Sequence, residues 1–175
     1  MFKLRFEKHK INYWAERYSY TEDDHRVAEL GKQARIQGYL TKDELLRFFD
    51  WKTRRRGRSR CLRNDENYIK EITRFAFTTS EDRLRIEVLT LLDGVQWPIA
   101  SAILHFVFPE NYPILDFRAL WSLGIEKPPP YCFRFWKAYT DTCKMLSEAN
   151  NISLRTLDRA LWQYSKEKQS DQKPV

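Results

Sequence analysis

Apolar residues recur at helical spacing along most of this chain. Side chains three or four positions apart share one face of a helix, so this spacing indicates amphipathic helices. They are predicted over residues 23–37, from 42 to about 53, after Asn64, after Ser80, over 99–107 and 117–123, from about 133 to 149, and after Ser153. Only the N-terminus leaves room for a short strand. The pattern predicts an all-α protein of about eight helices, a single domain over residues 1–175 with its core at 21–165 and a polar tail at 166–175.

Residues that cap helices support these boundaries. Thr41 and Glu44 match a capping box, in which each side chain accepts a hydrogen bond from the other residue's backbone N–H. Asn64, Ser80 and Ser153 are the expected N-caps of later helices. The helix after Asn64 is expected to present an apolar face made of Tyr68, Ile69, Ile72, Phe75 and Ala76.

A short break at residues 93–96 separates two of the predicted helices. It contains one glycine, Gly94, and the helix that follows is almost wholly apolar, which predicts a buried helix at the centre of the domain. Backbone N–H groups at the start of such a helix, together with the helix dipole, favour a phosphate group. An ordinary pair of packed helices fits the turn equally well, so the turn alone leaves phosphate binding open.

Positive charge is concentrated in one segment. The chain has a net charge of +7, from 31 basic and 24 acidic residues, and residues 52–63 contain seven cations and no acid. These cations are Lys52, Arg54, Arg55, Arg56, Arg58, Arg60 and Arg63. Arginine suits fork-shaped contacts to phosphate, and such a segment would add a large, salt-dependent term to DNA affinity. A solvated run of charge and a nuclear localisation signal are the other interpretations of this basic segment.

Composition argues against several classes of protein. No apolar run is long enough to span a membrane, and the N-terminus lacks the apolar stretch of a secretion signal, so we expect a cytoplasmic protein, associated with the nucleoid if it is bacterial. Cys61, Cys132 and Cys143 are too few and too widely spaced for a disulfide framework or an iron–sulfur cluster, and we expect them to be reduced. His25 and His105 have no partner pattern for metal ligation.

Residues 84–123 resemble the helix-hairpin-helix DNA glycosylase superfamily, which includes endonuclease III, the adenine glycosylase of mismatch repair, 8-oxoguanine glycosylase and the alkylbase glycosylases. The family pattern is a Leu-Pro-Gly-Val-Gly hairpin, an apolar helix, a loop with proline, and an aspartate that opens the next helix. Its counterparts here are Leu92 to Gln96, residues 99–107, Pro113 and Asp116, and Gly124 is expected to end the next helix in a left-handed conformation. The resemblance implies a glycosylase-like helical fold that binds double-stranded DNA, and we expect a monomer.

The resemblance also implies roles for individual residues. Asp116 would be the catalytic carboxylate, which stabilises positive charge on the deoxyribose and activates water. A plain N-cap is the alternative for Asp116. Arg118 would bind phosphate, as would the hairpin residues Gly94, Gln96, Pro98 and Ile99. The backbone carbonyls of Thr90, Leu92 and Val95 would hold a structural monovalent cation, and no other cofactor is expected.

Three positions depart from the family pattern. Gln96 replaces the second hairpin glycine and Asp93 replaces the hairpin proline, which implies that the turn is held differently. Pro98 stands where bifunctional members carry the lysine that attacks the sugar. Proline has no nucleophilic side chain, so we expect a monofunctional enzyme in which water attacks and no lyase step follows.

Aromatic residues near the proposed site are candidates for a base pocket. A glycosylase turns its target base out of the DNA stack and holds it between aromatic or apolar faces. Trp51, Trp97 and Tyr112 could provide them, with core packing as the alternative for each.

The sequence therefore predicts a monofunctional DNA N-glycosylase of base-excision repair, which hydrolyses the bond between a damaged or modified base and deoxyribose. A non-catalytic helix-hairpin-helix DNA-binding module of a repair or defence complex is the main alternative. A helical protein-interaction domain is a third possibility. No motif encodes the identity of the substrate base, because that depends on the shape of the pocket.

Overall fold

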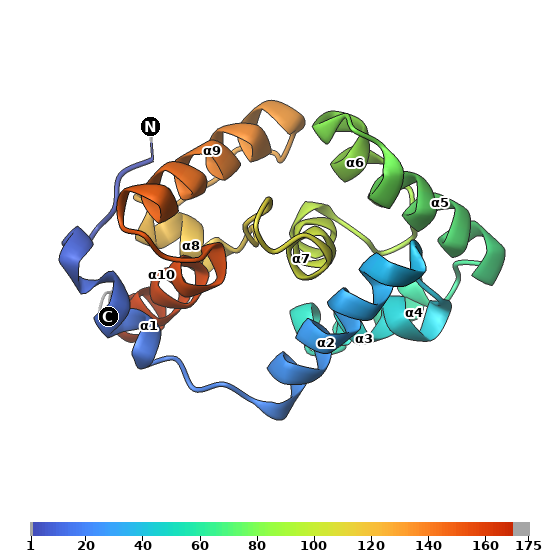
Figure 1. Cartoon of the computed structure of the whole chain (residues 1–175), viewed down its shortest axis with the longest axis horizontal. Coiled ribbons are helices and arrows are strands. Elements are labelled where there is room, and N and C mark those ends of the chain that lie inside the picture. The colour runs from blue at the N-terminus through green and yellow to red at the C-terminus, as the bar shows by residue number, and fades with distance from the viewer. Residues whose placement is uncertain (1, 170–175) are drawn as a thin grey trace. The chain divides into compact units, whose positions relative to one another are not determined.

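The structure, a computed structural model, describes residues 2–169, in which helices are the only regular secondary structure (Figure 1). Its elements are a 3₁₀ turn η1 (Lys8–Lys10) and the helices α1 (Ile11–Glu16), α2 (Glu22–Gln37), α3 (Lys42–Thr53), α4 (Arg58–Cys61), α5 (Glu66–Thr78), α6 (Asp82–Leu89), α7 (Trp97–Val107), α8 (Phe117–Ser122), α9 (Phe133–Ala149) and α10 (Leu154–Lys168). No strand occurs within these residues, so the prediction of an all-α protein is confirmed. Residues 2–169 contain ten α-helices, among them the short α1 and α4, which the sequence pattern did not predict.

The chain divides into two compact units. The first unit combines the N-terminal residues up to Ser19 with the chain from Glu110 onward, and the second unit is Tyr20–Pro109. Each unit has its own packed helices and is described separately below. The single domain expected from the sequence stays a prediction, and residues 170–175 of the predicted tail lie outside the described residues.

Helix α7 forms the centre of the second unit, as its apolar sequence predicts. Every residue from Ile99 to Val107 is buried, and α2, α3 and α6 pack against this helix. Gly31 of α2 lets two backbones approach closely, since a Cβ there would lie 2.2 Å from the carbonyl oxygen of Phe106. The ring of Phe48, from α3, stacks on that of Phe106 with centroids 6.0 Å apart. These contacts form a densely packed apolar core around α7.

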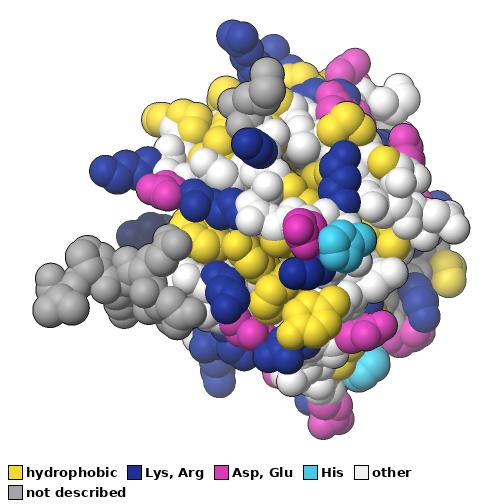
Figure 2. Space-filling model, turned by 90° about the vertical axis from the view of Figure 1, so that its left-hand side faces the viewer, with side chains coloured by type: hydrophobic (Ala, Val, Ile, Leu, Met, Phe, Trp, Pro, Cys, Tyr) yellow, Lys and Arg dark blue, Asp and Glu magenta, His cyan; other side chains and the backbone are white. Residues whose placement is uncertain are grey.

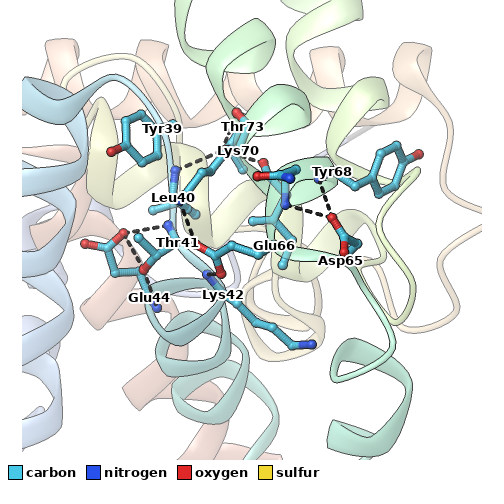
Figure 3. A network of polar contacts seen from close by, with 12 residues as sticks. Tyr39, Leu40, Thr41, Lys42, Glu44, Asp65, Glu66, Tyr68, Lys70 and Thr73 are labelled. Carbon is cyan, nitrogen blue, oxygen red and sulfur yellow. Dashed lines mark hydrogen bonds and ion pairs between the residues drawn. The ribbon is translucent and has the colours of Figure 1, made fainter.

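A polar network joins the start of α3 to α5 in the second unit (Figure 3). The capping box is confirmed: Thr41 N–H donates to Glu44 Oε2 at 2.7 Å, and Glu44 N–H donates to Thr41 Oγ1 at 3.3 Å. Glu66 Oε2 accepts a hydrogen bond from the Lys42 N–H at 2.9 Å, and this contact is the main cause of a lowered pKa at Glu66. The cap of α3 is thereby tied to the first turn of α5.

Two predicted caps are wrong by one residue. Asp65, not Asn64, caps α5, because its Oδ1 accepts from the N–H of Asn67 at 2.8 Å. Helix α6 begins after Glu81, and no side chain caps it, so Ser80 is not its cap. Neighbouring residues of similar capping ability make the position of a boundary ambiguous in sequence.

The predicted apolar face of α5 is also partly wrong. Tyr68 and Phe75 are 43% and 46% exposed, whereas Ile69 and Ala76 are fully buried. Residues at the edge of an apolar stripe can face solvent, because the outer side of a surface helix contacts water and not another helix.

Helix α10 forms the centre of the first unit and packs against α1, α8 and α9. Its predicted cap is confirmed, since Ser153 Oγ accepts from the Thr156 N–H at 3.0 Å. The N-terminal segment lies beside the end of α8 without forming a strand: Lys3 N–H donates to the Leu123 carbonyl at 2.8 Å, and Arg5 N–H donates to that of Ser122 at 2.9 Å. Gly124 ends α8 with φ of +83°, as predicted.

Figure 2 shows one face, on which lysine and arginine side chains surround exposed hydrophobic side chains, with a few acidic groups among them. Within residues 2–169, no helix is both long enough and apolar enough to cross a membrane.

Candidate nucleic-acid interface

The predicted hairpin is present between α6 and α7. The Val95 N–H donates to the Leu92 carbonyl at 3.0 Å and closes the turn, in which Gly94 has a left-handed φ of +83°. Helix α7 starts at Trp97, two residues before the predicted start, and Pro98 stands in its first turn, where a backbone N–H has no partner within the helix. The turn at residues 93–96 is called the hairpin turn below.

Two backbone amides of the hairpin turn have no acceptor in the part of the chain that the structure describes. The Asp93 and Val95 amides are bonded within the second unit, whereas those of Gly94 and Gln96 donate to no group of residues 2–169. Gln96 is the N-cap of α7, an 11-residue helix whose dipole adds positive potential at this end. Unbonded amides at such a position are donors for an anion.

The basic segment packs directly on the hairpin turn. A Cβ on Gly94 would lie 3.0 Å from the backbone nitrogen of Cys61 and 3.3 Å from the Cβ of Arg60. The turn therefore rests on the backbone of α4, the short helix inside the basic segment. Both the positive φ and this close approach favour glycine at this position.

Asn64, the residue after the basic segment, holds the turn in place. Its side chain is bonded to both backbone groups of Asp93: Nδ2 donates to the Asp93 carbonyl at 2.9 Å, and Oδ1 accepts from the Asp93 N–H at 2.8 Å. Nδ2 also donates to the Cys61 carbonyl at 2.9 Å, and Asn64 is 5% exposed. The sequence did not reveal this role, because nothing in it distinguishes an asparagine that holds a turn from one that caps a helix.

Acidic neighbours balance part of the basic segment. Asp50 accepts from Arg58 Nε at 3.1 Å and lies 3.9 Å from Arg55 Nε, and Asp93 lies 3.3 Å from Arg63 Nε. Arg54, Arg56 and Arg60 are exposed and form no ion pair with residues 2–169. The cations of this segment thus differ in how available they are to a ligand.

A pocket of about 430 Å³ lies where the basic segment meets the hairpin turn. It is lined by Phe49, Thr53, Arg56, Gly57, Arg60, Arg63, Asp93, Gly94, Gln96 and Ile99, and is called the arginine pocket below. The structure therefore brings together five of the residues predicted to bind DNA: Arg56, Arg60, Gly94, Gln96 and Ile99. Lys52, Arg54, Arg55, Arg58 and Pro98 are not among its lining residues.

Asp116 belongs to the first unit and caps α8. Its Oδ1 accepts from the Arg118 N–H at 2.8 Å, and the side chain is half-buried. The preceding residue pair is buried, and Tyr139 Oη donates to the Ile114 carbonyl at 2.7 Å, which fixes this stretch against α9. Burial and the negative charge of Asp116 raise the pKa of Tyr131. Asp116 is therefore the N-cap of α8, and a role for it in chemistry stays a prediction.

Arg118 lies close to two aromatic rings of the first unit. Its guanidinium carbon is 5.2 Å from the centroid of the Phe117 ring and 5.4 Å from that of Trp162. These cation–π contacts orient the side chain. Its binding to phosphate stays a prediction.

The three aromatic candidates for a base pocket have different surroundings. Trp51 donates from Nε1 to Asp24 Oδ1 at 3.2 Å and meets the Phe106 ring edge-on at 4.9 Å. Tyr112 is 6% exposed and stacks on the ring of Trp136 at 5.7 Å, while Trp97 is half-buried at the start of α7. Trp51 and Tyr112 therefore contribute to the packing of their own units.

The predicted cation ligands lie on the turn between α6 and α7. The Leu92 carbonyl already accepts the Val95 N–H, and a carbonyl oxygen can accept a second contact. The cation at Thr90, Leu92 and Val95 stays a prediction. Among the described residues, no cluster of three or more histidine, cysteine, aspartate or glutamate side chains could hold a metal ion.

Comparisons with protein-family models, curated proteins and solved structures find no match to this chain.

Proposed function

We propose that this protein binds double-stranded DNA through the hairpin turn and the basic segment. The observation that carries the proposal is their packing, in which Gly94 rests on α4 and Asn64 holds both backbone groups of Asp93. This packing gathers two unbonded amides and several arginines on one surface of the second unit. Amides at a helix start can fix the position of a DNA strand, while the arginines supply affinity by releasing counterions.

We further propose that the protein is a monofunctional DNA N-glycosylase of the helix-hairpin-helix superfamily, with Asp116 as its catalytic carboxylate. When the bond between base and sugar breaks, positive charge develops on the deoxyribose, and a fixed carboxylate stabilises it and activates water. The bond from the Arg118 N–H holds the Asp116 carboxylate in place at the start of α8. Pro98 offers no nucleophile, so water completes the reaction and the strand is not cut.

A base-release assay on duplexes that contain oxidised, alkylated, deaminated or phage-type modified bases tests the catalytic proposal. We expect abasic sites from at least one duplex, and at least a hundredfold loss of rate in Asp116→Asn, on the order of the loss of a main electrostatic group. Asp141→Asn is the matched control, because Asp141 is an exposed aspartate of the same unit, paired with Lys137. Full activity in Asp116→Asn contradicts the mechanism.

A non-catalytic DNA-binding module is the second candidate. The packing of Trp51 and Tyr112 within their units favours it, because a base pocket needs aromatic faces that a base can reach. Such a module would bind duplex with strong salt dependence and release no base from any member of the panel.

A further inference from the structure

The arginine pocket is concave and strongly positive, which is more than a contact with an internal backbone phosphate requires. We propose that it binds the terminal phosphate of a DNA strand, a phosphate monoester at a strand end. This inference rests on the proposed binding of DNA and adds a preference for one kind of DNA.

Charge is the first argument for a monoester. The pocket is lined by three arginines, Arg56, Arg60 and Arg63, and one acid, Asp93, which gives a net charge of +2. A phosphodiester within a strand carries one negative charge. A phosphate monoester carries about 1.5 to 2 negative charges at neutral pH, so it matches the pocket more closely.

The available donors are the second argument. Arg56 Nε donates to the Thr53 carbonyl at 3.3 Å, and Arg63 Nε lies 3.3 Å from the Asp93 carboxylate, so both guanidinium groups are anchored at one end. Their terminal nitrogens, and all those of Arg60, donate to no group of residues 2–169. A monoester offers three strong acceptor oxygens, and arginine can bind two of them at once.

The backbone amides and the shape of the pocket also favour the end of a strand. Gly94 and Gln96, whose amides have no acceptor within residues 2–169, both line the pocket beside the start of α7. A volume of about 430 Å³ lies in the range of small-ligand pockets, roughly 300–1,000 Å³. A group at a strand end can enter such a concavity, whereas an internal phosphate is flanked by sugars on both sides. The hydrogen bonds from Asn64 to Asp93 keep the hairpin turn, which lines the pocket, in place without a ligand.

Fluorescence anisotropy on a DNA hairpin with a single open end tests the proposal. Three versions of one sequence carry a 5′-phosphate, a 3′-phosphate or only hydroxyl groups at that end. We expect one phosphorylated version to bind roughly tenfold more tightly than the hydroxyl version, which is the effect of one charge-assisted hydrogen bond. Equal binding of all three versions overturns the inference but leaves the proposed DNA binding intact. Absence of binding at low salt contradicts the DNA-binding proposal itself.

Variants locate the effect within the basic segment. The ratio of the affinities for the phosphorylated and the hydroxyl version should fall to about one in Arg60→Gln. The same should hold, independently, in Arg56→Gln. Arg54→Gln is the matched control: Arg54 is an exposed arginine of the same segment outside the pocket, and its loss should weaken all three complexes while the preference stays tenfold. A preference that survives Arg56→Gln and Arg60→Gln overturns the assignment to this pocket.

Competition identifies the source of the phosphate. A deoxynucleoside monophosphate should displace the phosphorylated DNA only at concentrations far above that of the DNA, because the rest of the strand adds contacts. A mononucleotide that binds as tightly as the DNA end would show that the pocket serves a free nucleotide, and would overturn the inference.

Discussion

Asn64 joins two segments whose bonded residues are 29 positions apart. It is buried, and its amide meets a donor and an acceptor of the same residue, Asp93. Such a two-way contact fixes both the position and the direction of the hairpin turn. A proline in place of Asp93 would have no N–H to donate to the Asn64 side-chain oxygen, so this contact requires a residue other than proline here.

Replacement of Asn64 by alanine should loosen the hairpin turn. The Asp93 N–H loses its acceptor, and we expect the free energy of unfolding to fall by about 1–3 kcal/mol, the cost of unmade buried hydrogen bonds. Urea denaturation measures this loss, and hydrogen exchange should show faster exchange at the Asp93 amide. Asn67→Ala is the control, since Asn67 is exposed on α5. Unchanged exchange at Asp93 would contradict the role of Asn64.

The cysteines should differ sharply in reactivity. Burial raises the pKa of Cys61 to about 11 and that of Cys143 to about 12, whereas Cys132 is exposed. The thiolate is the reactive form, and a raised pKa makes it scarce at pH 8. Brief alkylation of the folded protein at pH 8 should therefore modify Cys132 alone, as measured by mass spectrometry, and urea should release all three thiols. Rapid modification of Cys143 in the folded protein would contradict its burial.

At the scale of the helices, α9 holds the segment that leads to Asp116 through one buried hydrogen bond. The Tyr139 hydroxyl donates to the Ile114 carbonyl at 2.7 Å inside the first unit, and burial raises the pKa of Tyr139 well above its usual value. The phenol is therefore protonated and able to donate throughout the neutral range.

Tyr139→Phe removes this hydrogen bond without changing the ring. We expect a loss of about 1–2 kcal/mol in stability, because the Ile114 carbonyl is left buried without its partner. If Asp116 is catalytic, base release should fall while DNA affinity stays unchanged. Thermal unfolding and the base-release assay measure the two effects. Tyr131→Phe serves as the stability control, since no hydrogen bond of the Tyr131 hydroxyl occurs within residues 2–169.

The longer helices were predictable because their apolar residues repeat over several turns. The bounds predicted for α9 agree with Phe133–Ala149, and those for α2 and α3 agree to within one residue. Helices α1 and α4 have six and four residues, too few for a period to emerge. Their stability comes from packing, which a local pattern does not reveal.

The candidate site was predictable only in parts. The arginines and the hairpin were evident as local patterns, but their packing depends on a single buried asparagine and on the close approach of Gly94 to Cys61. Neither contact produces a periodic or compositional signal. The ion pairs with Asp50 were missed for a similar reason, because that acid lies just outside the segment whose charges were counted.

At the scale of the whole molecule, the net charge of +7 overstates the charge that DNA can use. In the basic segment, Arg55 and Arg58 are near Asp50, and Arg63 is near Asp93. A cation that already has a carboxylate partner contributes less to counterion release, because its charge is partly neutralised before DNA arrives. The effective number of phosphate contacts should therefore be smaller than the seven cations of the sequence.

The salt dependence of DNA binding measures the effective number of phosphate contacts. With Arg54, Arg56 and Arg60 as the main contacts, the logarithm of the binding constant for unphosphorylated duplex should fall with the logarithm of salt concentration at a slope of about −3; seven contacts would give about −6. Arg56→Gln should make the slope shallower by about 1, and Asp50→Asn, which releases two arginines, should make it steeper. Arg47→Gln, an exposed α3 arginine paired with Asp43, should leave it unchanged. A slope near zero would instead favour a protein-interaction domain, since phosphate contacts necessarily release counterions.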